Sequence, residues 1–178
     1  MEISRIKKQY LEEMVPEMMK TFEYSNKFMV AKITKIVLSM GLGNRDIKKN
    51  TEDLTLIAGQ KAIVTKAKKS VSQFKVRQGF DSGAMVTLRG NNMYHFIDRL
   101  INIALLNDRY FAGIPNRSFN FNKYVTLSLG IKDKRIFSEI KSDSIKSEGL
   151  NITICSNSRN KDEFKTLIKM FGLPIIGD

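Results

Sequence analysis

The side chains that could carry acid–base, nucleophilic or metal chemistry are few and scattered in this sequence. His95 is the only histidine and Cys155 is the only cysteine. A catalytic base must lie within hydrogen-bonding reach of its nucleophile or substrate, and a zinc site needs several Cys or His ligands. Neither the GxSxG turn of hydrolases nor the GxxxxGK[ST] loop of nucleotide hydrolases occurs. We therefore expect no enzyme, no metal and no cofactor.

Each isolated candidate also has a structural interpretation. His95 falls inside an amphipathic helical pattern, where a helix-surface position explains it. Cys155 follows β-branched residues and is interpreted as a small core residue in a strand. Two acidic pairs, Glu52 with Asp53 and Asp162 with Glu163, stand at expected helix starts, where the helix dipole favours negative charge. An enzyme acting on a nucleotide would need a constellation that the sequence does not offer.

Residues 54–89 carry a different chemistry, the binding of an anion. This stretch contains a single acid, Asp81. It contains seven cations, which are Lys61, Lys66, Lys68, Lys69, Lys75, Arg77 and Arg89. The whole chain has a formal net charge of +12 and an isoelectric point near 9.8. Clustered positive charge of this kind is typical of nucleic-acid-binding proteins.

Polar and aromatic side chains are interleaved with these cations. Hydroxyl and amide groups that can bond phosphates or 2′-hydroxyls are supplied by Gln60, Thr65, Ser70, Ser72, Gln73 and Thr87. Phe74 or Phe80 could stack on an unpaired base. The structural alternative is a solvated lysine edge that prevents sheets from aggregating.

Membranes and acidic proteins are the competing anionic partners. The sequence contains no apolar run of about 18 residues that could cross a bilayer. Glu2, Glu12, Glu13 and Glu17 argue against a secretory signal or an acid-poor transit peptide at the N-terminus. We therefore expect no membrane partner, although a basic module that binds membrane surfaces or acidic proteins remains the alternative function.

Helical periodicity predicts the elements that position these residues. Residues 2–22 form one apolar stripe, and Pro16 predicts two helical pieces or a kink. Further helices are expected at 51–58, ending at Gly59, at 91–107 and at 162–171.

Alternating and β-branched residues predict the strands. They are expected at 28–42, 62–65, 72–76, 84–89, 124–130, 137–140 and 150–155. In the first of them Ala31, Ile33, Lys35, Val37 and Ser39 should share one side. A turn over 78–83 would make residues 75–85 a hairpin with glycines at both shoulders.

Several stretches resemble one known family, the large-subunit ribosomal protein five of bacterial type. They are DLTLIAGQKAIVTKAKKSVSQFKVR at 53–77, VTLRG at 86–90, Met93-Tyr94 with FIDRLINI at 96–103, Arg117-Ser118-Phe119 and GLNITI at 149–154. They follow the order of the family and span nearly the whole chain. The resemblance implies a single α+β domain, residues 1–178, in which helices pack on a mainly antiparallel sheet to form two layers. It also implies an extended basic hairpin.

The resemblance also implies a function and partners. Members of this family bind 5S rRNA and large-subunit rRNA in the central protuberance, extend a hairpin toward P-site tRNA, and touch small-subunit ribosomal protein thirteen across an intersubunit bridge. Matching positions imply RNA contacts for Gln60, Lys61, Thr65, Lys66, Lys68, Lys69, Ser70, Lys75, Thr87 and Arg89. The tRNA-facing tip would be Arg77, Gln78, Gly79, Phe80, Asp81 and Ser82. No homo-oligomer is expected.

The sequence departs from the family pattern in several places. The loop after Gly43 is shorter than expected, Ser39 stands where Asn is usual, and Ala112 replaces the expected Arg. These departures, with the Asn-, Lys- and Ile-rich composition, favour a divergent, mitochondrially encoded ribosomal protein of the mitochondrial matrix. A bacterial cytoplasmic ribosome is the alternative.

Overall fold

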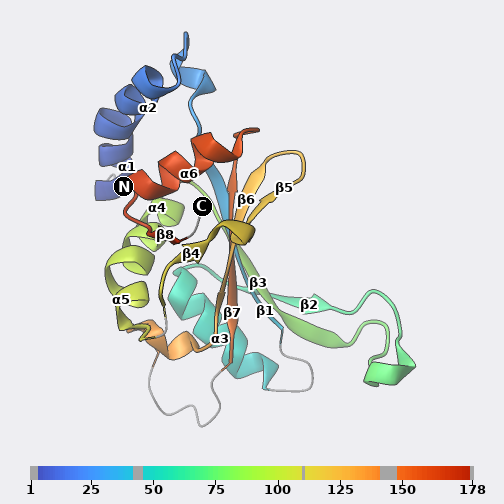
Figure 1. Ribbon diagram of the computed structural model, residues 1–178. Coiled ribbons are helices and arrows are strands. Elements are labelled where there is room, and N and C mark those ends of the chain that lie inside the picture. Colours follow the sequence, from blue (N-terminus) through green and yellow to red (C-terminus); the bar gives the residue numbers. More distant parts are fainter. Residues whose placement is uncertain (1–3, 42–45, 110, 141–147, 177–178) are drawn as a thin grey trace.

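An antiparallel sheet with helices on one of its faces organises the molecule (Figure 1). The computed structural model describes residues 4–41, 46–109, 111–140 and 148–176. The strands of the six-stranded sheet are, in spatial order, β2 (Ile63–Lys66), β3 (Asp81–Leu88), β1 (Ile33–Gly41), β7 (Leu150–Ser156), β6 (Val125–Ile131) and β5 (Phe119–Phe121). A short parallel pair joins β4 (Ile114–Pro115) to β8 (Ile175–Ile176). The predicted α+β architecture is confirmed.

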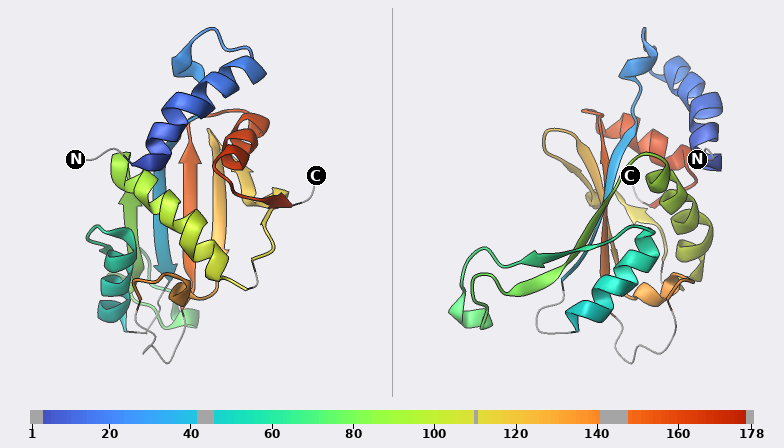
Figure 2. Two further views of the ribbon diagram at one scale, coloured as in Figure 1. Left: turned by 90° about the vertical axis from the view of Figure 1, so that its left-hand side faces the viewer. Right: turned by 180° about the vertical axis from the view of Figure 1, so that it is seen from behind.

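The helices gather on the same side of the sheet, as both views of Figure 2 show. They are α1 (Arg5–Gln9), α2 (Val15–Thr21), α3 (Ile47–Ala58), α4 (Gly90–Arg99), α5 (Leu105–Asn107) and α6 (Lys161–Met170). Wider π-turns at Tyr10–Met14 and Leu100–Ala104 join α1 to α2 and α4 to α5. Short 3-10 turns occupy Lys27–Met29, Ser72–Phe74, Asn116–Ser118 and Lys134–Ile136.

The core lies between the two layers because alternate residues of each strand face the helices. One row across the sheet shows this: Leu127, Ile154, Ile36 and Leu88 are register neighbours, and all four are buried. From the helices, Leu54, Ile57, Phe96 and Phe164 are buried in the same core. Among the described residues, no helix has the length and apolar character needed to cross a membrane.

Two predicted elements differ in the structure, whereas the N-terminal one agrees. A π-turn at Tyr10–Met14 separates α1 from α2 directly before Pro16, which lies in the first turn of α2, so the two helical pieces predicted there are found without a break between them. Helix α3 begins at Ile47 rather than at Thr51, which moves Asp53 out of the first turn. Residues 137–140 form a turn instead of a strand.

Strand β1 also contains an irregularity that sequence periodicity could not anticipate. Its pairing with β7 shifts between Ile33 and Lys35, so that Ile33 faces the core although Lys35 does not. A bulge of this kind places two residues opposite one and changes the phase of the alternation. The single side predicted from Ala31 to Ser39 is therefore wrong before the bulge. The loop after Gly43 lies outside the described residues.

Candidate nucleic-acid interface

A long hairpin projects from the sheet on the side away from the helices (Figures 1 and 2). We call residues 65–83 the arm. Strands β2 and β3 pair from Ile63–Met85 to Lys66–Asp81, and backbone hydrogen bonds between Ala67 and both Phe80 and Gly79 continue the pairing beyond the sheet. Val71 and Val76 then exchange two hydrogen bonds of 2.9 and 3.2 Å. The arm therefore keeps a defined backbone without a helix packed on it.

The tip of the arm lies at Ser72–Lys75. A 3-10 turn covers Ser72–Phe74, and Lys75 has a left-handed backbone conformation with φ of 52°. The strand predicted at 72–76 is therefore wrong, because polar alternation there reflects solvent on both sides rather than one buried face. Only the first part of the turn predicted over 78–83 is found, at Gln78–Gly79, where the Phe80 N–H donates to the Arg77 carbonyl oxygen at 3.1 Å, and this turn does not close the hairpin. Arg77 to Phe80 lie on the returning side of the arm, whereas Asp81 and Ser82 already belong to β3.

Gly83 fixes the root of the arm against the sheet. A Cβ atom at this position would lie 2.3 Å from the backbone carbonyl oxygen of Met40. Glycine therefore allows β3 to approach β1 closely at the place where the arm leaves the body. A glycine inside a strand often marks such an approach, so the sequence contained a signal that Gly83 belongs to a strand and not to the turn.

The arm presents cations to solvent. Exposed side chains of one sign follow it from root to tip and back; these arm cations are Lys66, Lys68, Lys69, Lys75 and Arg77. In the part of the chain that the structure describes, none of them forms an ion pair. Ser70 accepts a hydrogen bond from the backbone N–H of Gln78 at 2.9 Å, so it also helps to hold the two sides of the arm together.

The other residues with a predicted RNA contact lie at the base of the hairpin. Helix α3 ends at Ala58, and Gly59 in the left-handed conformation turns the chain toward β2. The Gln60 side chain then donates to the carbonyl oxygen of Thr87 at 3.3 Å, and Arg89 is the residue that precedes the first turn of α4. Lys61 is exposed beside them. The predicted RNA-contact residues thus divide into a base group, Gln60, Lys61, Thr87 and Arg89, and an arm group that contains Thr65, Ser70 and most of the lysines.

The sheet face away from the helices is lined by small polar residues. One row across it contains the register neighbours Ser128, Thr153, Val37 and Thr87, and the next contains Thr126, Cys155 and Lys35. We call these seven residues the open face. Most of them are partly exposed, and together they offer hydroxyl groups, one thiol and one ammonium group to a partner.

Sequence reasoning missed most of the open face, although a signal was present. In β6 and β7 the hydrophobic residues alternate with Thr126, Ser128, Thr153 and Cys155, which marks the solvent side of a half-buried strand. The interpretation of Cys155 as a core residue is wrong, because its side chain is partly exposed on this face. Only Thr87 of the seven was predicted as a site residue.

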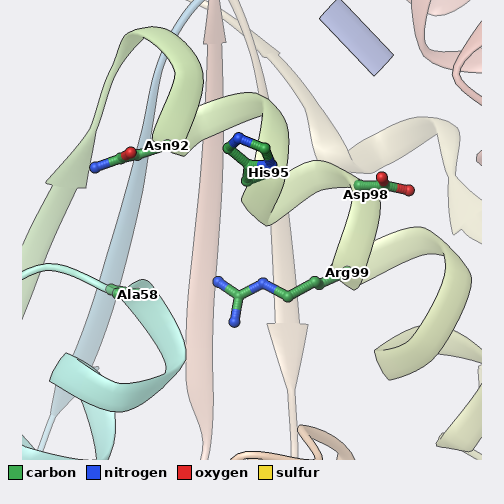
Figure 3. Close-up of a pocket in the computed structure, with 6 residues that line it drawn as sticks. Ala58, Asn92, His95, Asp98 and Arg99 are labelled. Carbon is green, nitrogen blue, oxygen red and sulfur yellow. The ribbon is translucent and has the colours of Figure 1, made fainter. Parts of the chain in front are cut away.

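A hollow on the helical side has a different character (Figure 3). It has a volume of about 380 Å³ and lies between the end of α3 and the outer surface of α4. His95 is exposed there, as predicted. Arg99 points toward α3, where it donates to the carbonyl oxygen of Ile57 at 2.9 Å, and Asp98 points away.

The charged groups of this hollow are already engaged in structural contacts. Asp98 pairs with Arg5 at 2.7 Å, and Arg99 pairs with Glu139. Among the described residues, no group of three His, Cys, Asp or Glu side chains is arranged to hold a metal ion. The hollow therefore lacks a free base beside His95 and offers no catalytic arrangement.

The chain also contains a buried charge cluster that sequence reasoning did not find. The Lys134 side chain is only 2% exposed, and its ammonium group lies 2.8 Å from Asp53 and 3.4 Å from Glu148. The same group donates to the side-chain oxygen of Asn50. Because α3 begins at Ile47, Asp53 lies in the second turn of this helix. It pairs there with Lys134 instead of stabilising the first turn of α3.

Two protein-family models and several bacterial proteins match most of this chain. Residues 26–77 match the family model of ribosomal protein L5, and residues 81–175 match the model of the C-terminus of the same ribosomal family. The chain is 46% identical to the large ribosomal subunit protein uL5 of Geobacter sulfurreducens and 44% identical to that of Geotalea uraniireducens. Each comparison covers 97% of this chain and 98% of the relative. The uL5 protein of Macrococcus caseolyticus is 43% identical over the same shares.

Proposed function

Because this chain belongs to the ribosomal protein L5 family, whose members are structural and non-enzymatic proteins of the large ribosomal subunit, we propose that it binds 5S rRNA. The observation that carries this proposal is the arm, whose cations form no ion pair among the described residues, together with an open face of hydroxyl groups. The cations would neutralise phosphates, and the hydroxyl groups would bond phosphates and 2′-hydroxyls.

Different parts of the protein surface would contact different parts of the RNA. The base group and the open face form one continuous surface, because Thr87 is a register neighbour of Val37. A folded RNA such as 5S rRNA would lie on this surface and on the lysines nearest the root of the arm, while the tip of the arm, Ser72–Lys75, reaches beyond it. Contacts to large-subunit rRNA in the central protuberance, to P-site tRNA and to small-subunit ribosomal protein thirteen are part of the same proposal and rest on family membership.

We place the ribosome in a bacterial cytoplasm. The relatives named above are bacterial proteins, and they give no support to the mitochondrial matrix that the composition favoured. A gene found in a mitochondrial genome would reverse this assignment.

A competition experiment tests the proposal. The protein is bound to labelled bacterial 5S rRNA and challenged with unlabelled 5S rRNA or with a scrambled RNA of equal length. If about six cations contact phosphates, the logarithm of the affinity should fall with the logarithm of salt concentration with a slope of roughly −4 to −5. Equal competition by both RNAs, or a slope near zero, would contradict 5S rRNA recognition.

An arm variant locates the contacts within the molecule. Replacing Lys66, Lys68 and Lys69 together by Ala should weaken 5S rRNA binding and make the salt slope shallower by roughly 2 to 3. A matched control replaces Lys20, Lys48 and Lys169, which are equally exposed lysines of the helices, and should leave the slope nearer to its original value. Strong binding of the wild-type protein to anionic vesicles, without preference for 5S rRNA, would instead favour the membrane-surface alternative.

A further inference from the structure

A second cluster of cations and exposed aromatic rings lies at the end of the sheet away from the arm. The arm leaves the sheet where Gly83 pairs with Gly41, whereas this cluster lies where Ile33 pairs with Ser156 (Figure 1). We call it the corner, and its residues are Lys32, Lys123, Arg159, Lys161, Phe121 and Tyr124. None of these residues was predicted as a site residue.

Hydrogen bonds from backbone N–H groups hold the three segments of the corner together. Lys32 and Asn157 exchange two bonds: the Lys32 N–H donates to the Asn157 side chain at 2.7 Å, and the Asn157 N–H donates to the Lys32 carbonyl at 3.1 Å. The N–H of Val125, which follows Tyr124, donates to the carbonyl of Ser158 at 2.9 Å. Segments far apart in the sequence therefore deliver their side chains to one place with a fixed backbone.

The charge of the corner is positive and largely uncompensated. Residues 26–41, 113–132 and 149–161 contain no acid at all. In the described part of the chain, none of the four corner cations forms an ion pair. The nearest acids in the sequence are Asp162, which lies 4.0 Å from Lys165, and Glu163, which accepts a hydrogen bond from Ser158 at 2.6 Å.

The exposed rings indicate the kind of anion. Phe121 is 55% exposed and Tyr124 is 38% exposed, and the Lys123 ammonium group lies 5.8 Å from the centre of the Tyr124 ring. Exposed aromatic rings next to lysine or arginine bind single-stranded nucleic acid, because unpaired bases stack on the rings while the cations neutralise phosphates. The other three corner cations lie on segments that hydrogen bonds join to the segment of Tyr124, so rings and cations share one end of the sheet.

We propose that the corner is a second RNA-binding site, which holds an unpaired stretch of RNA by stacking bases on Phe121 and Tyr124. The inference rests on the proposed function as an RNA-binding ribosomal protein, and it adds a site separate from the arm. The row of Thr126, Cys155 and Lys35 connects the Tyr124 side of the corner to the rest of the open face, whereas Phe121, which pairs with the buried Val125, lies at the edge of the sheet at the end of β5. One RNA could therefore contact the corner with a loop and the open face with its helical part.

The test uses the full chain and two probes, a 12-nucleotide oligouridine and a 5S rRNA transcript. Replacing Phe121 and Tyr124 together by Leu removes stacking but keeps apolar side chains and the net charge. Oligouridine binding should weaken about tenfold or more, with an unchanged salt slope. Replacing the four corner cations by Ala should also weaken oligouridine binding and make the slope shallower by roughly 3. Thermal unfolding of each variant verifies that it is folded.

The outcomes separate this inference from the proposed function. Unchanged oligouridine affinity in both corner variants would overturn the corner site, even if the arm variant loses 5S rRNA. A wild-type protein that does not prefer 5S rRNA would overturn the proposed function, whatever the corner binds. Competition by polyglutamate that is stronger than competition by oligouridine would assign the corner to an acidic protein and would also overturn the inference.

Discussion

The arm and the buried cluster around Lys134 use the same residue type in opposite ways. On the arm, exposed lysines outnumber the single acid, Asp81, and among the described residues none of them forms an ion pair, so their charge is available to a partner. In the cluster, one lysine is enclosed by two carboxylates and an amide oxygen, all of which belong to the protein. The number of lysines therefore says little about binding, since what matters is whether the fold itself supplies the counter-charge.

Physical chemistry predicts different consequences for the two sets of lysines. A buried ion pair contributes little net stability compared with well-packed apolar residues, but breaking it by removing one partner is costly. An exposed lysine contributes little to stability, and removing it changes mainly the interaction with an anion. Substitutions in the cluster should therefore change folding, and substitutions on the arm should change binding.

The largest effect is expected from replacing Lys134 by Met. The substitution leaves the Asp53 and Glu148 carboxylates buried beside each other without a cation, so the free energy of unfolding should fall by about 3 to 5 kcal/mol. Urea denaturation followed by circular dichroism measures this change. At low urea, the remaining folded protein should bind 5S rRNA with wild-type affinity.

A companion variant sharpens this prediction. Replacing Lys134 by Met, Asp53 by Leu and Glu148 by Leu removes all three charges, and most of the lost stability should return. If the triple variant is as unstable as the single one, packing around the Lys134 stem rather than the unpaired carboxylates dominates.

Gly83 at the root of the arm should give the next largest effect. Its substitution by Ala places a Cβ atom against the Met40 carbonyl, so β3 must move away from β1 and stability should fall by about 1 to 3 kcal/mol. Gly130 is the matched control, because a Cβ there would meet only the side-chain oxygen of Asn151 at 3.7 Å. Equal loss of stability in both variants would argue against close packing at the arm root.

Cys155 provides a chemical probe of the open face. It is the only cysteine and is partly exposed, so a maleimide should react with it in the free protein. When 5S rRNA is present at ten times its dissociation constant, the reaction should slow about tenfold, because only free protein reacts.

A cysteine on the helical side is the control for this footprint. Replacing Cys155 by Ser and His95 by Cys puts the thiol in the hollow of Figure 3, where RNA should leave the reaction rate unchanged. Protection of both positions would point to aggregation around the RNA, and protection of neither would remove the open face from the interface.

Sequence patterns predicted most of the fold and only some of the residues on the proposed RNA-binding surfaces. The amphipathic helix at 91–107 and the strands at 124–130 and 150–155 were found because one face of each is buried in a single core. The arm was harder to predict, since both of its sides meet solvent and polar alternation at Ser72–Lys75 carries no information about burial. The corner and the Lys134 cluster depend on contacts between distant segments, which periodicity in a single chain does not encode.

The smallest effects are expected at the tip of the arm, and they test whether the tip and the root of the arm contact different RNAs. Replacing Phe74 and Lys75 by Ala should change the free energy of unfolding by no more than about 0.5 kcal/mol, because Phe74 is 75% exposed and Lys75 is also exposed. Since the tip lies beyond the base group and the open face, 5S rRNA affinity should stay near that of the wild type.

If the tip touches P-site tRNA, ribosomes carrying this variant should release that tRNA faster. A variant of Arg77 and Gln78, on the returning side, is the control, and stronger tRNA release from it would restore the tip position predicted from sequence.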